Sequence, residues 1–142
     1  MIPVRDFNNL CTDLVTTITD LKEHILVAED NHAVNRLTGK KDIILVAVIP
    51  SSDRAGRPSS SVDENTTFFF VVKKFTPSKN EAQELDQYEA TQIVIEQVKD
   101  YILGKMEDGC HFLHRLEPSS IHIDPAYNIF GGFSGWSMSL TF

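Results

Sequence analysis

Two long segments of the chain place apolar residues at helical spacing. The first, residues 4–22, carries them at intervals of three and four, which stacks them on one face of an α-helix. The second opens at Ser78 and Glu81, which match a capping box, and runs to about Glu107, close to Gly109. The two apolar stripes consist of Phe7, Leu10, Cys11, Leu14, Val15, Ile18 and Leu21, and of Leu85, Tyr88, Ile95, Val98, Ile102 and Met106. Both stripes predict amphipathic helices that pack on a sheet.

Strand patterns occupy most of the remaining apolar sequence. Residues 42–49 and 66–72 are nearly continuous runs of β-branched and aromatic residues, which indicate strands buried on both faces. Residues 24–29 form a shorter candidate strand. Residues 121–124 and 136–142 alternate between apolar and polar positions, as a strand with one buried face does.

Polar or glycine-rich segments separate these elements. Residues 30–41 are polar, end in Gly39-Lys40-Lys41 and predict a turn, and residues 128–135 predict a tight glycine-rich turn before the last strand. Residues 51–65 are rich in Ser, Gly and Pro and far exceed the two to five residues usual for a hairpin loop. We therefore expect a long hairpin loop at 51–65, either a mobile arm or a functional loop, between two strands that need each other.

These elements predict one α+β domain over residues 1–142, with the order α-β-β-β-α-β-β. We expect a largely antiparallel sheet with two helices packed on one face. A chain of 142 residues, 42% of them hydrophobic, is long enough to bury roughly 70% of the surface that its unfolded form exposes. It therefore needs no disulfide framework, and Cys11 and Cys110 are expected to be reduced thiols, although a bridge between them stays open.

Charge and hydropathy exclude several classes of partner. The formal net charge of −7 argues against the electrostatic attraction that nucleic-acid binders use and against docking on anionic lipid. No apolar run approaches the ~18 residues that a membrane-spanning helix needs. The N-terminus also lacks the apolar segment of a signal peptide. We expect neither membrane association nor sequence-specific nucleic-acid binding.

The sequence offers little catalytic chemistry. Cys110, His111, His114, His122 and Asp124 are the only cluster with metal-ligand residue types, and they lack recognised zinc spacings. We expect no metal and no cofactor, with His114, His122 and Asp124 as weak candidates.

Nucleophilic and phosphate-binding motifs are also missing. There is no Gly-x-Ser-x-Gly, and residues 131–135 lack the lysine and the glycine spacing of a phosphate loop. Cys11 lies on the buried helix stripe, where a thiol is inert. We therefore predict that the protein is not an enzyme.

The aromatic residues suggest a surface for binding other proteins. Phe130 and Phe133 belong to the glycine-rich segment, and aromatic residues in loops are candidate interface anchors. The order of elements, the long arm and the closing stretch 128–142 together resemble the tail-terminator and neck-ring proteins of tailed bacteriophages and prophages. The resemblance covers most of the chain as an order of elements, and stretch 128–142 is its sharpest part.

The resemblance implies a structural subunit of a virion that is assembled in the bacterial host cytoplasm. Such a subunit forms a homo-oligomeric ring at the head–tail junction or tail end and contacts neighbouring neck or tail-tube proteins. Residues 51–65 would then be an arm that reaches a neighbour, with Arg54, Arg57 and Val62 as contacts. The family has no catalytic residues. The alternatives are a cytosolic small-molecule or metal-binding domain that uses the histidine cluster, or another kind of partner-binding module.

Overall fold

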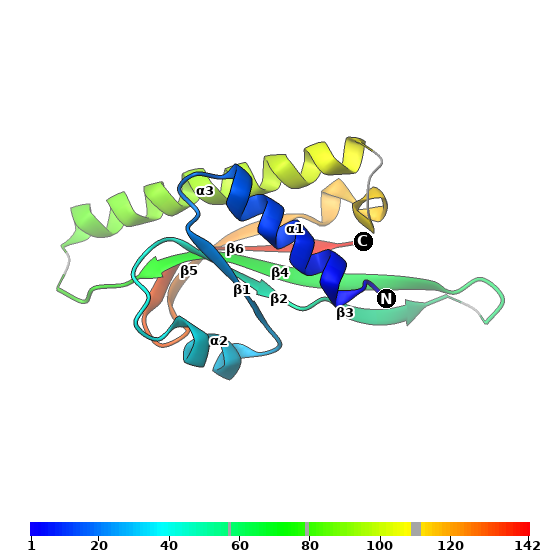
Figure 1. Cartoon of the computed structure of the whole chain (residues 1–142), viewed down its shortest axis with the longest axis horizontal. Helices are drawn as coiled ribbons and strands as arrows, with labels where there is room; N and C mark the ends of the chain where they lie inside the picture. Colours follow the sequence, from blue (N-terminus) through cyan, green and yellow to red (C-terminus); the bar gives the residue numbers. More distant parts are fainter. Residues whose placement is uncertain (57, 79, 109–111) are drawn as a thin grey trace.

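The computed structural model describes residues 1–56, 58–78, 80–108 and 112–142. Within these residues, helices lie on both faces of one mixed sheet (Figure 1). The helices are α1 (Val4–Thr17), α2 (Asp30–Leu37) and α3 (Glu81–Glu107), with short 3-10 turns η1 (Phe112–Arg115) and η2 (Pro118–Ser120). The strands are β1 (Glu23–Val27), β2 (Ile44–Val48), β3 (Ser51–Ala55), β4 (Val62–Lys74), β5 (His122–Ile129) and β6 (Phe133–Thr141).

The 13-residue strand β4 runs through the middle of the sheet. The strand order is β1-β2-β4-β6-β5, and β3 also pairs with β4. β2 and then β3 line one side of β4, because Ala47 lies opposite Phe69 and Ser51 lies opposite Thr66. β6 lines the other side. All these pairings are antiparallel except β1 with β2, which is parallel.

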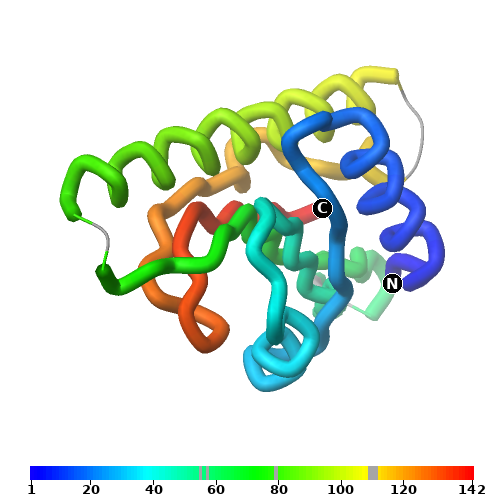
Figure 2. Tube along the Cα trace, turned by 60° about the vertical axis from the view of Figure 1, so that its left-hand side comes forward, coloured from blue at the N-terminus to red at the C-terminus, as the bar shows by residue number. Residues whose placement is uncertain are grey.

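Helices α1 and α3 cover one face of the sheet, and the short α2 covers part of the other (Figures 1 and 2). The α1–α3 side holds the larger core, where the rings of Phe7 and Phe69 stack 5.6 Å apart. The α2 side holds a smaller core. Its buried members are Ile25, Val27, Ala33, Leu37, Ile44, Val46, Val72 and Phe133. α2 leaves the β5–β6 half of its face uncovered, and this difference shapes the candidate site.

The predicted α+β class is confirmed, but its details need correction. The sheet is mixed and six-stranded, and the described residues form three helices instead of two. The extra helix, α2, occupies the segment predicted to be a turn at 30–41. Ala33 and Leu37 lie one helical turn apart and are fully buried against the sheet. Two apolar anchors are enough for an eight-residue helix because tertiary packing, not intrinsic propensity, stabilises it.

Several element boundaries also differ from the prediction. Helix α1 ends at Thr17 instead of residue 22. A run of β-branched residues around Thr17 lowers the helix propensity there. The capping box of α3 uses Asn80 and Gln83 instead of Ser78 and Glu81. Strand β5 runs to Ile129 instead of ending at residue 124. It continues through Pro125 because it is an edge strand, where a missing N–H is tolerated.

The predicted loop at 51–65 is mostly strand. β3 and the first residues of β4 extend the β2–β4 pairing outward, since β3 ends at Ala55 and β4 begins at Val62. The buried run 42–49 is confirmed, since Ile44 to Ala47 are fully buried on both faces of β2. Glycine-rich residues 130–132 form the predicted tight turn between β5 and β6.

Gly135 lies where the backbones of β6 and β4 are in close contact. A Cβ at this position would lie 2.1 Å from the backbone oxygen of Val71, far inside van der Waals contact. Gly104 in α3 offers a contrast, because a Cβ there would meet nothing within 4 Å.

Gly135→Ala should therefore destabilise the protein, because the methyl group forces β6 away from β4. We expect a loss of about 1–3 kcal/mol in the free energy of unfolding, as for other overpacked cores. Gly104→Ala is the matched control and should gain up to about 1 kcal/mol, since alanine favours helix. Urea unfolding followed by circular dichroism measures both. Equal stability of the two variants would contradict the close approach of β6 to β4.

Candidate functional site

The most distinctive feature is a two-stranded arm that projects past the helices (Figure 1). It consists of β3 and residues 62–66 of β4, and we call it the arm. Arg54 lies opposite Asp63, and Ala55 lies opposite Val62. Val62 exposes 57% of its surface, so the outer end of the arm is apolar as well as charged. The arm is therefore an ordered ribbon and not a simple loop.

Local contacts hold the arm in shape. Gly56 has φ +105°, and a Cβ there would lie 2.7 Å from the backbone oxygen of Ser60, so the turn requires glycine. Arg54 Nε donates to Ser61 Oγ at 2.8 Å, and Ser51 Oγ donates to the Thr66 carbonyl at 3.3 Å. None of these contacts buries much apolar surface. An isolated two-stranded hairpin is only marginally stable in water. The outer part of the arm resembles such a hairpin, so we expect its folding to contribute little stability.

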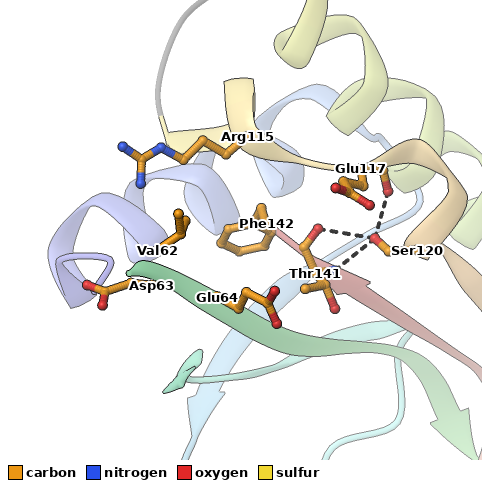
Figure 3. A pocket seen from close by; sticks show the side chains of 8 residues that line it. All are labelled: Val62, Asp63, Glu64, Arg115, Glu117, Ser120, Thr141 and Phe142. Atoms are coloured by element: carbon orange, nitrogen blue, oxygen red, sulfur yellow. Dashed lines mark hydrogen bonds between the residues drawn. The ribbon is translucent and has the colours of Figure 1, made fainter. Parts of the chain in front are cut away.

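A hollow of about 660 Å³ lies along the β4 strand of the arm, beside the end of β6 (Figure 3). Ser120 links two segments that line the hollow, since its hydroxyl donates to the Glu117 and Thr141 carbonyls at 2.7 and 3.1 Å. The Phe142 ring lies between Val62 and Thr141. The lining residues are Val62, Asp63, Glu64, Arg115, Glu117, Ser120, Thr141 and Phe142. The hollow thus combines carboxylates, one guanidinium and an apolar floor.

The carboxylate of Asp63, in the arm, interacts with several positively charged groups. The Met1 ammonium donates to its Oδ2 at 3.0 Å, and this hydrogen bond, followed by the ammonium charge and by Arg54 and Arg115, lowers the Asp63 pKa. A lowered pKa favours the ionised carboxylate in the fold, so the contact is present above the ordinary carboxyl pKa and is lost as the pH falls. The carboxylate is still 46% exposed, which leaves room for a second cationic partner.

A second surface patch lies on the uncovered half of the sheet. The rings of Phe68 and Phe70 stack 6.4 Å apart, and Phe130 meets Phe70 edge-on at 5.0 Å. Phe68 exposes 42% of its surface. Phe130 has φ +52°, a conformation unusual for a bulky residue, and its contact with Phe70 helps to hold it there.

The predicted interface residues separate into two regions. Arg54 and Val62 belong to the arm, and Phe130 belongs to the aromatic patch of the open face. Phe133, predicted to be a loop anchor, instead opens β6 and is buried to 2% exposure in the smaller core. The strand alternation of β6 begins three residues earlier than expected, and this turns the Phe133 ring inward. Arg57 lies outside the described residues.

The weak metal candidates do not form a site in the described chain. His122 and Asp124 share a face of β5, whereas His114 belongs to η1 and lines a different small pocket near Phe112. The described residues contain no group of three His, Cys, Asp or Glu side chains placed to hold a metal ion. Cys110 and His111 lie outside the described residues.

The hollow and its Glu64, Glu117 and Ser120 escaped the sequence analysis. Glu64 comes from β4, and Glu117 and Ser120 come from the η1–η2 segment. No spacing in the sequence relates segments that meet only in the fold. The one usable signal was the unusual length of the 51–65 segment.

The chain matches no protein-family model and no curated protein. None of the helices in the described part of the chain is long and apolar enough to cross a membrane. The function must therefore be argued from the arm, the hollow and the open face.

The reactivity of Cys11 tests the prediction that its thiol is buried and inert. It is a free thiol on the buried face of α1, and burial raises its pKa to about 12. We expect Cys110→Ser protein to resist iodoacetamide at pH 8 in the folded state and to react at one site in denaturant. Mass spectrometry measures the modification. Rapid labelling of the folded variant would show that Cys11 is accessible and would reopen thiol chemistry.

Proposed function

We propose that this chain is a structural subunit of a phage-like particle and assembles as a ring at the head–tail junction or tail end. The arm carries this proposal. Its strands hydrogen-bond to each other, yet no described helix covers its outer end, where Val62 and the charged side chains meet solvent. A ribbon of this kind is stabilised when a neighbouring protein covers it.

The open face of the sheet supports the same function. Phe68, Phe70 and Phe130 form an aromatic cluster beside the half of the sheet that α2 leaves uncovered. Aromatic side chains are enriched in protein–protein interfaces. A ring subunit needs more than one contact surface, because each copy meets two neighbours and a tube or head protein.

The alternative, a cytosolic small-molecule or metal-binding domain, gains no support from the described side chains. Metal analysis of the untagged protein, together with His114→Ala and His122→Ala, tests it directly. Bound metal that either substitution removes would favour this alternative over the ring subunit.

Removing the arm tests the ring proposal. A variant that joins Asp53 directly to Glu64 through Asn-Gly keeps their cross-strand pair and replaces residues 54–63 with a favoured two-residue turn. We expect light scattering to show a closed oligomer for the unmodified protein, or a monomer that assembles on its tail-tube partner. The shortened variant should stay monomeric, while its thermal unfolding midpoint remains within a few degrees because the core is intact.

A matched pair of substitutions separates the arm from general surface effects. Val62→Asp lies on the arm, and Val34→Asp lies on α2, where valine is also exposed, at 37%. We expect only Val62→Asp to weaken assembly. A strictly monomeric protein that ignores every tail and neck protein offered to it would contradict the proposed function.

A further inference from the structure

The open face of the sheet carries a continuous row of side chains along β4. Alternate residues of a strand share one face, so this row, which we call the β4 row, consists of Val62, Glu64, Thr66, Phe68 and Phe70. Phe70 packs against the smaller core, which places the row on the α2 side of the sheet. Eight residues of strand rise about 26 Å, so the row passes from the body to the outer end of the arm. The arm and the aromatic patch therefore form one elongated surface.

The body end of the β4 row is aromatic. Phe68 stacks on Phe70, and Phe130 meets Phe70 edge-on. In β6, Ser139 lies opposite Phe68 and Ser137 lies opposite Phe70, so only small side chains flank the two rings on that side. None of the described helices covers the rings, and Phe68 stays 42% exposed (Figures 1 and 2). This end of the row offers apolar surface to a partner.

The arm end of the β4 row is acidic. Asp53 of β3 lies directly opposite Glu64, and both residues are exposed. Neither carboxylate forms an ion pair with another described residue. Like charges placed directly opposite each other destabilise a pair of strands. A cationic group above the two carboxylates would remove this repulsion, so this end of the row favours a basic partner.

The rest of the open face strengthens the acidic character. Asp124 of β5 shares this face and adds a third carboxylate. Among the described residues that flank the β4 row on this face in β3, β5 and β6, none is Lys or Arg. Arg54 pairs with Asp63 and so belongs to the opposite face. Lys74 lies farther along β4, where its ammonium donates to the Gly131 carbonyl at 3.3 Å.

The dimensions of the open face fit one α-helix. Neighbouring strands lie about 4.8 Å apart, so β4, β6 and β5 together span about 10 Å, which is the diameter of a helix with its side chains. The length of the β4 row, about 26 Å, corresponds to about 17 helical residues. Helices also cover the opposite face and the neighbouring part of this one (Figure 1). A helix beside α2 would complete that layer of the domain.

A second copy of this chain does not supply a suitable helix. The apolar faces of α1 and α3 are already buried in the larger core. The first turn of α3 also carries Glu81 and Glu84, which would meet the carboxylates of the open face with the same charge. The complementary helix therefore belongs to a different protein.

We propose that a basic, amphipathic helix of a different protein lies along the β4 row, with apolar side chains on Phe68 and Phe70 and Lys or Arg side chains over Asp53 and Glu64. The inference rests on the proposed function, because it names the chemistry of the neighbouring head or tail protein. Helices that lay an apolar stripe on a groove are a common mode of protein recognition.

Single-stranded nucleic acid is the competing class of partner. Its bases stack on exposed aromatic residues of sheets in several RNA-binding domains. Those surfaces also carry basic side chains that neutralise the phosphates. The β4 row has carboxylates at the corresponding positions, so the charge favours a basic protein segment.

Synthetic peptides test the chemistry of the contact. The probe is a fluorescein-labelled helical peptide of about 18 residues, with Leu on one face and Lys on the other. Its control has Glu in place of Lys. We expect the Lys peptide to bind about tenfold or more tightly than the Glu peptide, as measured by fluorescence anisotropy, and to weaken as salt is added. Absence of binding, or equal binding of the two peptides, would overturn the proposal.

Substitutions locate the apolar part of the contact. Phe68→Ser should weaken binding of the Lys peptide by about tenfold or more. Leu85→Ser on α3 is the matched control, because Leu85 is also exposed, at 62%, and its affinity should stay within about twofold. Ser139→Lys keeps every aromatic ring and places a cation beside Phe68, so it should weaken binding as strongly. Full affinity of both Phe68→Ser and Ser139→Lys would show that the peptide binds elsewhere.

A pair of double variants locates the basic end of the helix. Asp53→Asn with Glu64→Gln should weaken the Lys peptide by about fivefold or more and reduce the salt dependence of binding. Its thermal midpoint should stay equal or rise, because the repulsion between the two carboxylates is gone. Glu81→Gln with Glu89→Gln on α3 is the control of equal charge and should leave affinity unchanged. Equal affinity of the two double variants would overturn the assignment of the basic end.

The remaining outcomes separate this contact from other conclusions. Displacement of the Lys peptide by oligouridylate would overturn the proposal in favour of nucleic acid. Light scattering that shows a ring, with no binding of the Lys peptide, would overturn the helix contact and leave the ring function intact. Peptide binding that depends on Phe68, by a protein that stays monomeric with every tail and neck protein, would overturn the ring function and leave the helix contact intact.

Discussion

The backbone pairing of β4 is the interaction on which the rest of the structure depends. Its inner half lies between β2 and β6 and carries Phe69, Val71 and Val72, which are fully buried. Its outer half continues past the helices as the arm. One strand therefore joins the core to the surface that we assign to assembly. Because register is fixed in the buried half, the position of every arm residue is fixed with it.

An exposed two-stranded arm is a liability for a monomeric protein. Open strand edges attract other strands, and natural sheets usually block them. Here, Pro125 has no N–H to offer at the β5 edge, and Arg36 donates to the Leu26 carbonyl at the β1 edge. In the arm, no described strand pairs with the outer edge of β3, which includes Ser52 and Arg54. The selective protection indicates that the open edges serve a purpose. Charged residues on those edges then limit which strands can add, since like charges placed opposite each other repel.

The sequence predicted the parts of the fold that depend on local pattern. The stripe of α1 and the apolar run of β2 follow directly from periodicity. In α3, Ile95, Val98 and Ile102 are buried as predicted, whereas Leu85 is 62% exposed and the polar Gln87 and Thr91 are buried instead. The prediction failed at α2, because only two buried residues, Ala33 and Leu37, anchor that helix. It also failed at the arm, because a segment rich in Ser, Gly and Pro has low strand propensity and β3 forms only by pairing with β4. The hollow could not be predicted at all, since Glu64, Glu117 and Thr141 meet only through tertiary contacts.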